Sequence, residues 1–102
     1  MHQPLESIAR NEIIESDICI IGAGAAGITL ALELDRLGHK VLLLESGTFE
    51  YDAEVQEMNK GENVGQPYFP LASSRLRFFG GTTNHWTGQC SILDEQDFKE
   101  RP

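Results

Sequence analysis

The chain has 102 residues, of which 16 are acidic and 8 are lysine or arginine, so its net charge is −8. This charge argues against nucleic acid or an anionic membrane as a partner, and the length allows at most one small domain. The two cysteines, Cys19 and Cys90, form no CxxC pair, so the sequence indicates neither a disulfide framework nor a zinc site. A reducing, cytoplasmic location is therefore expected.

Residues 1–16 are polar with scattered aliphatic side chains, and we expect a leader or short helix on the domain surface. The apolar run that follows lacks a basic flank, contains three glycines and is too short to span a bilayer. It predicts neither a signal peptide nor a membrane helix.

Residues 17–45 read as a β-α-β unit. A short apolar run at 18–21 predicts a buried parallel strand, and a second run at 41–44 predicts its neighbour. The helix between them has a broad apolar face, and Gly38 is placed to end it. Glycines with GxGxxG spacing open this helix: Gly22, Gly24 and Gly27.

Each of these glycines has a predicted task. The first permits the sharp turn from strand to helix, the second lets a pyrophosphate approach the backbone, and the third lets helix and strand pack closely. Glu45 follows the second strand, where a carboxylate accepts hydrogen bonds from ribose hydroxyls and repels a 2′-phosphate. The whole arrangement predicts a dinucleotide site and disfavours NADP.

The middle of the chain holds less chemistry. Carboxylates scattered over residues 50–62 are interpreted as a solvated face, because no histidine accompanies them. Residues 53–59 are expected to form one or two helical turns ended by Gly61, and residues 65–72, with two prolines, an extended ordered loop.

A second informative stretch, SRLRFFGGTTNHWTGQ, covers residues 74–89. Arg75 and Arg77 alternate with apolar residues, as in an extended segment. The diglycine that follows is consistent with a second phosphate or ribityl contact, but composition alone favours a tight turn before a capped helix. No second histidine stands at helical spacing from His85, so no metal site is predicted.

Together the two stretches resemble the N-terminal part of the glucose–methanol–choline (GMC) flavoprotein oxidoreductases. The resemblance covers residues 17–102 and includes Glu45-Ser46-Gly47, RFFGGTTNHWTG and ILDEQDF. Asn84-His85-Trp86-Thr87 is most similar to the T-H-W-T motif of the pyranose 2-oxidase branch and its bacterial sugar-oxidising relatives. In that branch the histidine is joined to the flavin 8α-methyl, and the threonine after the tryptophan lies near flavin N5.

The resemblance implies FAD as cofactor, with His85 as the candidate covalent link and Thr87 as a flavin-contacting hydroxyl. Asn84 departs from the usual threonine, so the alternative is that His85 and Trp86 pack against a non-covalent flavin. The predicted cofactor-binding residues are Gly22, Ala23, Gly24, Ala25, Ala26, Gly27, Glu45, Ser46, Arg75, Gly80, Gly81, Thr82, Asn84, His85, Trp86 and Thr87.

The predicted fold class is α/β, with residues 17–102 as an incomplete Rossmann-like FAD-binding domain that lacks its substrate domain. The implied reaction is oxidation of a CH–OH group, in a sugar or polyol, by hydride transfer to flavin N5. No residue matches the family's C-terminal catalytic base, so the sequence predicts no catalytic residue and little or no turnover from this chain alone. Two alternatives stay open: a nucleotide-binding module or fragment without activity, and an NAD-dependent Rossmann dehydrogenase. The electron acceptor and the oligomeric state are not predicted.

Overall fold

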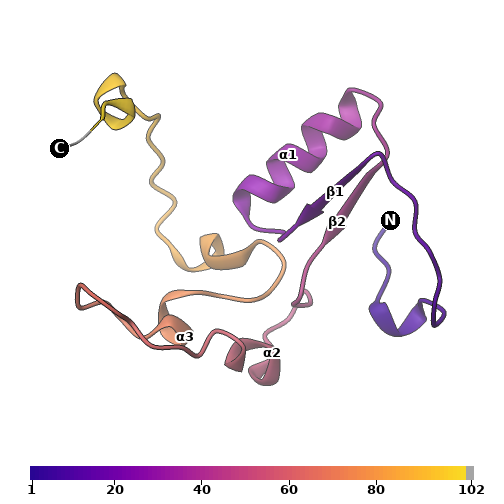
Figure 1. The fold of residues 1–102 in the computed structure, drawn as a ribbon, viewed down its shortest axis with the longest axis horizontal. Helices are drawn as coiled ribbons and strands as arrows, with labels where there is room; N and C mark the ends of the chain where they lie inside the picture. Colours follow the sequence, from indigo (N-terminus) through magenta and orange to yellow (C-terminus); the bar gives the residue numbers. More distant parts are fainter. Residues whose placement is uncertain (101–102) are drawn as a thin grey trace.

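A parallel pair of strands with one connecting helix forms the ordered centre of the chain (Figure 1). The computed structural model describes residues 1–100. Strand β1 (Ile18–Ile21) pairs with β2 (Val41–Leu44) in a register that places Ile18 opposite Val41 and Ile21 opposite Leu44. Helix α1 (Ala25–Arg36) connects them and packs along the strands. Both strands lie where the apolar runs predicted them, and the α/β, Rossmann-like fold class is confirmed.

Helix α1 ends as its sequence predicts. The backbone N–H of Gly38 donates to the carbonyl of Asp35 over 2.9 Å, and that of His39 donates to the carbonyl of Leu34 over 3.1 Å. This pair of bonds is the Schellman arrangement, which satisfies carbonyls that the last helical turn leaves without partners. Lys40 then leads into β2, which begins at Val41.

Two short helices follow the sheet. Helix α2 (Ala53–Glu57) begins at Asp52, whose carboxylate accepts from the backbone N–H groups of Glu54 and Val55. The helical turns predicted at 53–59 are therefore confirmed, with the helix two residues shorter than the predicted range. Helix α3 (Leu71–Ser74) starts directly after Pro70, so the loop predicted over residues 65–72 ends earlier than expected. Proline suits this position because it lacks the N–H that a helix start leaves free.

Three 3₁₀ helices complete the element order. The first, η1 (Leu5–Ser7), lies ahead of β1; η2 (Gly81–His85) follows the diglycine; and η3 (Glu95–Phe98) lies near the end of the described chain. Asp94 and Asp97 cap η3 reciprocally, each side chain accepting from the other end of the turn.

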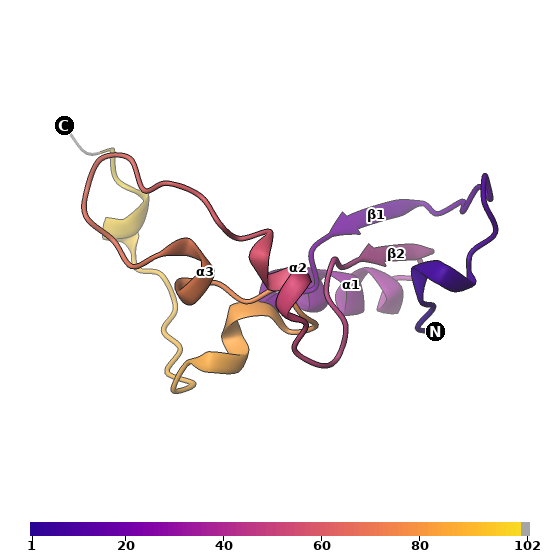
Figure 2. The same ribbon diagram turned by 90° about the horizontal axis from the view of Figure 1, so that it is seen from below.

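The chain after β2 extends away from the sheet instead of covering it (Figure 2). The radius of gyration is 16.8 Å, against roughly 13 Å for a compact domain of this length. Among residues 1–100 the one fully buried apolar residue is Ala23, while Ile21 in β1 is 86% exposed. Ala23 lies in the glycine turn, so the best-packed point of the chain is the turn itself. In the same residues, no helix is long and apolar enough to cross a membrane.

Candidate functional site: a glycine turn closed by a carboxylate and a diglycine

The turn between β1 and α1 is built by its first and third glycines. Gly22 has a φ of +100°, which side-chain-bearing residues rarely adopt, and its N–H donates to the Leu44 carbonyl over 2.7 Å. A Cβ on Gly27 would overlap the carbonyl oxygen of Gly22. The first glycine therefore makes the turn and the third lets α1 sit against it, as the spacing predicts.

Neither backbone strain nor side-chain packing requires a glycine at the second position of the motif, Gly24. Gly24 has a φ of −81°, which any residue can adopt, and an added Cβ would meet no protein atom within 4 Å. The space in front of Gly24 is open and belongs to both hollows described below. Glycine at this position therefore fits a ligand that approaches the backbone closely.

Glu45 closes the turn from the end of β2. Its Oε2 accepts from the backbone N–H of Ala23 over 2.7 Å, and its Oε1 accepts from the backbone N–H of Gly47 over 3.0 Å. These bonds hold the carboxylate at the carboxyl end of the two strands, the edge at which open α/β sheets bind ligands.

The diglycine lies directly on the glycine turn. The N–H of Gly80 donates to the Ala23 carbonyl over 2.7 Å, and Gly80 forms a parallel bridge with Gly24. Gly80 has a φ of +91°, and a Cβ on Gly81 would come within 3.3 Å of the Gly24 Cα. The structure thus brings together the two segments that the sequence singled out, although more than fifty residues separate them. The backbone of Ala23 contacts both Glu45 and Gly80: its N–H donates to Glu45, and its carbonyl accepts from Gly80.

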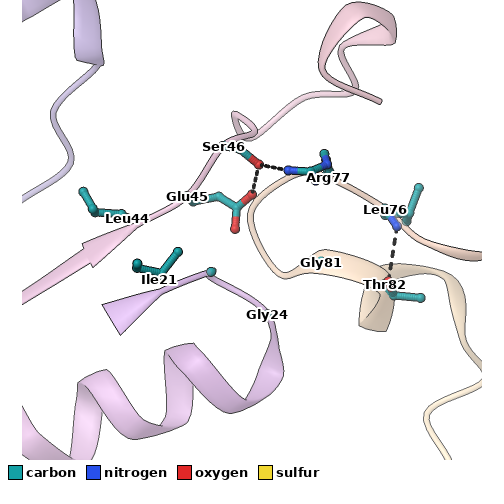
Figure 3. A pocket seen from close by; sticks show the side chains of 10 residues that line it. Ile21, Gly24, Leu44, Glu45, Ser46, Leu76, Arg77, Gly81 and Thr82 are labelled. Carbon is teal, nitrogen blue, oxygen red and sulfur yellow. Dashed lines mark hydrogen bonds between the residues drawn. The ribbon is translucent and has the colours of Figure 1, made fainter. Parts of the chain in front are cut away.

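Two adjoining hollows, of about 570 and 530 Å³, share Gly22, Gly24 and Thr82 at this contact. Both volumes fall within the range of small-molecule sites. The first, the Glu45 pocket (Figure 3), is lined by Ile21, Gly22, Gly24, Leu44, Glu45, Ser46, Leu76, Arg77, Gly81 and Thr82. The second, the helix pocket, is lined by Ile20, Ile21, Gly22, Gly24, Ala25, Ala26, Gly27, Leu30, Gly80, Thr82 and Thr83.

The remaining predicted residues lie outside both pockets. Arg75 is exposed, and Asn84 turns its side-chain amide back to the carbonyls of Phe79 and Gly81. His85, Trp86 and Thr87 are exposed at and just beyond the end of η2. No group of three or more metal-ligating side chains occurs within residues 1–100.

The structure also adds residues that the sequence did not single out as cofactor-binding. Arg77 and Leu76 line the Glu45 pocket, and Thr83 lines the helix pocket, where its hydroxyl donates to the Gly80 carbonyl. The alternation of residues 74–79 predicted an extended segment but not which arginine faces the site. In the structure a Cβ on Gly47 would overlap the Arg77 carbonyl, so glycine at this position lets the Arg77 segment pass close to the end of β2.

Comparison with known families matches residues 17–54 to the DAO model, described as FAD dependent oxidoreductase. The matched range includes β1, α1, β2 and Glu45. Among curated proteins, the chain is 31% identical over 83 residues to the flavin-dependent L-tryptophan oxidase RebO of Lentzea aerocolonigenes, a match covering 80% of this chain and 17% of that protein. No solved structure gives a significant match.

A second curated protein is the flavin-containing monooxygenase FMO GS-OX2 of Arabidopsis thaliana. It is 51% identical over 37 residues, which is 36% of this chain and 8% of that protein. The chain therefore spans less than a fifth of either relative's length. The prediction of FAD as the cofactor is confirmed. These matches agree with the coarser functional prediction of a flavin-binding segment like those of FAD-dependent oxidoreductases.

The resemblance to the GMC family was wrong. The matched family model is DAO, and both relatives are flavin enzymes of other kinds. The β-α-β unit is common to many FAD enzymes, so the GMC assignment depended on a short motif around the diglycine and His85. The roles of His85 as a covalent link and of Thr87 as a flavin contact were taken from that resemblance and have lost its support. That these residues contact flavin stays a prediction.

Proposed function

We propose that this chain binds the ADP half of FAD in a flavoenzyme that oxidises a small amine, with amino acids as the favoured donors. The observation that carries the FAD site is the Glu45 carboxylate, held on the Ala23 N–H over 2.7 Å beside a glycine that nothing in the protein requires. Ribose hydroxyls would bind at Glu45 and the pyrophosphate at Gly24 and the N-terminus of α1.

The chain's own groups fit this cofactor. The open space before Gly24 admits a phosphate against the backbone, and the first turn of α1 carries no acidic residue that would repel one. Glu45 would repel a 2′-phosphate, and this favours FAD over NADP as the cofactor. When bound, FAD supplies the two-electron oxidation. Residues 17–82 would hold the cofactor along the glycine turn.

The donor class is proposed from similarity. The relative that aligns with four-fifths of this chain is named for oxidation of L-tryptophan, and its match extends well beyond the β-α-β unit that FAD enzymes share. The CH–OH donor, sugar or polyol, was implied by the GMC resemblance and no longer has that support. An amine donor is therefore the better supported finer assignment.

The test uses the full-length protein. After purification, its visible spectrum is recorded, FAD is added if needed, and the flavin is titrated anaerobically with L-tryptophan, other L-amino acids, glucose and ethanol. We expect a flavin spectrum that an amino acid bleaches and that glucose and ethanol leave unchanged. Bleaching by a sugar or alcohol alone would overturn the donor class. A protein that takes up no flavin would overturn the proposal as a whole, and flavin without reduction by any donor would favour a binding module without turnover.

A further inference from the structure

Arg77 is the one cationic side chain that lines the Glu45 pocket, and it is held from three directions. Its Nε donates to Asn59 Oδ1 over 2.8 Å, its Nη1 donates to Ser46 Oγ over 3.1 Å, and its backbone N–H donates to Gln56 Oε1 over 3.1 Å. A long, flexible side chain fixed at both ends of its guanidinium is pre-organised, because little rotamer freedom is left to lose when a ligand binds.

This arginine has no carboxylate partner in the described chain. Within residues 1–100 the ion pairs are Arg36 with Glu33 and Lys60 with Glu57, although the chain carries twice as many acidic as basic residues. Arg75, two positions earlier, is exposed. The guanidinium of Arg77 is therefore directed to the hydroxyl of Ser46 and the amide of Asn59, not to a neutralising acid.

The bond from Arg77 sets the direction of the Ser46 hydroxyl. Arginine has only donors, so Ser46 Oγ accepts from it and must turn its own single proton elsewhere. That proton points to Glu45, whose Oε1 lies 3.3 Å from Ser46 Oγ. Figure 3 shows the resulting chain of contacts, from Arg77 through Ser46 to Glu45 along one wall of the pocket.

The same contacts decide which oxygen of Glu45 is left for a ligand. An ionised carboxylate offers about four acceptor positions. Oε1 receives the N–H of Gly47 and the hydroxyl of Ser46, while Oε2 receives only the N–H of Ala23. The open acceptor position is therefore on Oε2, the oxygen bonded to the glycine turn.

We propose that Arg77 is a positioning residue for the ribose of an adenine nucleotide: through Ser46 it occupies Oε1 of Glu45 and leaves Oε2 to accept a ribose hydroxyl. The inference rests on the proposed FAD site and names how that site recognises ribose. Arg77 itself need not touch the nucleotide. Its removal should weaken binding only of ligands that carry the ribose hydroxyls.

The test measures binding of two probes, ADP and 2′,3′-dideoxy-ADP, to full-length protein freed of flavin, by calorimetry. The variants are Arg77→Met, Ser46→Ala and their combination, with Arg77→Lys as the conservative change. Arg36→Met is the matched control, because it removes the same charge at the far end of α1. Since one charge-assisted contact is affected, we expect Arg77→Met to weaken ADP about three- to tenfold and dideoxy-ADP by less than about twofold.

The double variant should lose no more ADP affinity than the worse single variant, because both changes break the same series of hydrogen bonds from Arg77 through Ser46 to Glu45. Arg77→Lys should fall between wild type and Arg77→Met, since an ammonium keeps the charge but lacks the fork that reaches both Asn59 and Ser46. If Arg77→Met does not fold, Ser46→Ala alone must show the same hydroxyl-selective loss.

The inference would be overturned if Arg77→Met weakened binding of ADP and of dideoxy-ADP equally. It would also be overturned if the losses of ADP affinity in Arg77→Met and Ser46→Ala added up in the double variant, or if Arg75→Met weakened ADP binding more than Arg77→Met. These outcomes leave the proposed function standing, because wild type would still bind ADP. Failure of wild type to bind ADP or FAD at all overturns the proposed function instead.

Discussion

The carboxylate of Glu45 accepts a hydrogen bond from the backbone N–H of Ala23 over 2.7 Å, joining residues 22 positions apart. The contact ties the end of β2 to the turn after β1, and Ala23 is fully buried beneath it. A side chain that recognises ribose in related folds thus also holds the phosphate turn in place. In the proposed site, ribose binding and local structure would therefore depend on the same carboxylate.

Replacing Glu45 with glutamine should therefore weaken nucleotide binding. The amide has only one acceptor oxygen, so it cannot receive the N–H groups of both Ala23 and Gly47 and also a ribose hydroxyl. We expect ADP affinity to fall about tenfold or more, since hydrogen bonds to charged groups are among the stronger ones. The exposed Glu50→Gln is the charge-matched control. Unchanged ADP affinity in Glu45→Gln would contradict the ribose role.

The second and third glycines should respond in opposite ways to alanine. In Gly24→Ala the new methyl enters open space, so the melting temperature should hold while affinity for FAD or ADP falls at least about tenfold. In Gly27→Ala the methyl overlaps the Gly22 carbonyl, and overpacking of this kind costs about 1–3 kcal/mol in the free energy of unfolding. Thermal melts and nucleotide titrations of both variants decide this. Destabilisation of Gly24→Ala without a binding defect would argue against a ligand there.

The β-α-β unit could be read from the sequence because its signals are local. Apolar runs, glycine spacing and the stop at Gly38 each depend on a few neighbouring residues, and the structure places β1, β2 and the helix end accordingly. The tasks of Gly22 and Gly27 also follow from backbone geometry over a few positions. These features need no knowledge of the rest of the chain.

The sequence could not predict which of Arg75 and Arg77 lines the pocket, because contacts from another segment decide it. Gln56 and Asn59, from α2 and the residues just after it, bind the segment that carries both arginines and turn Arg77 toward Ser46. The family assignment failed for a related reason: a motif of a few residues around His85 was given more weight than its length supports. The β-α-β unit is common to many FAD enzymes, so its local signals indicate an FAD site without separating one FAD family from another.

Gln56 should prove to be the anchor of this segment. Its side chain is only 5% exposed; Nε2 donates to the carbonyls of Ala72 and Arg75 over 2.6 and 2.5 Å, and Oε1 accepts from Arg77. Gln56→Leu keeps the volume but removes the partner of the Ala72 carbonyl and of the Arg77 backbone N–H, and a buried group left unpaired costs about 1–3 kcal/mol. We expect chemical denaturation to show a decrease of that order in the free energy of unfolding.

The exposed Gln66→Leu makes the same chemical change where no buried partner depends on it and should leave the free energy of unfolding nearly unchanged. Because Gln56 also holds the Arg77 backbone, Gln56→Leu should weaken ADP binding as well. Equal stability of the two variants would show that the contacts of Gln56 contribute nothing to the fold.

Acid precipitation of the full-length protein should release its FAD into the supernatant. His85 is exposed at the last position of η2 and lines neither pocket, so no described contact holds its imidazole against a bound cofactor. We accordingly expect His85→Ala to bind flavin as wild type does, with Gly24→Ala as the control that does not. Flavin colour in the pellet, with flavin mass on the peptide containing His85, would contradict this expectation. That result would place the imidazole beside the isoalloxazine ring in the full-length protein and restore the covalent link that the sequence motif implied.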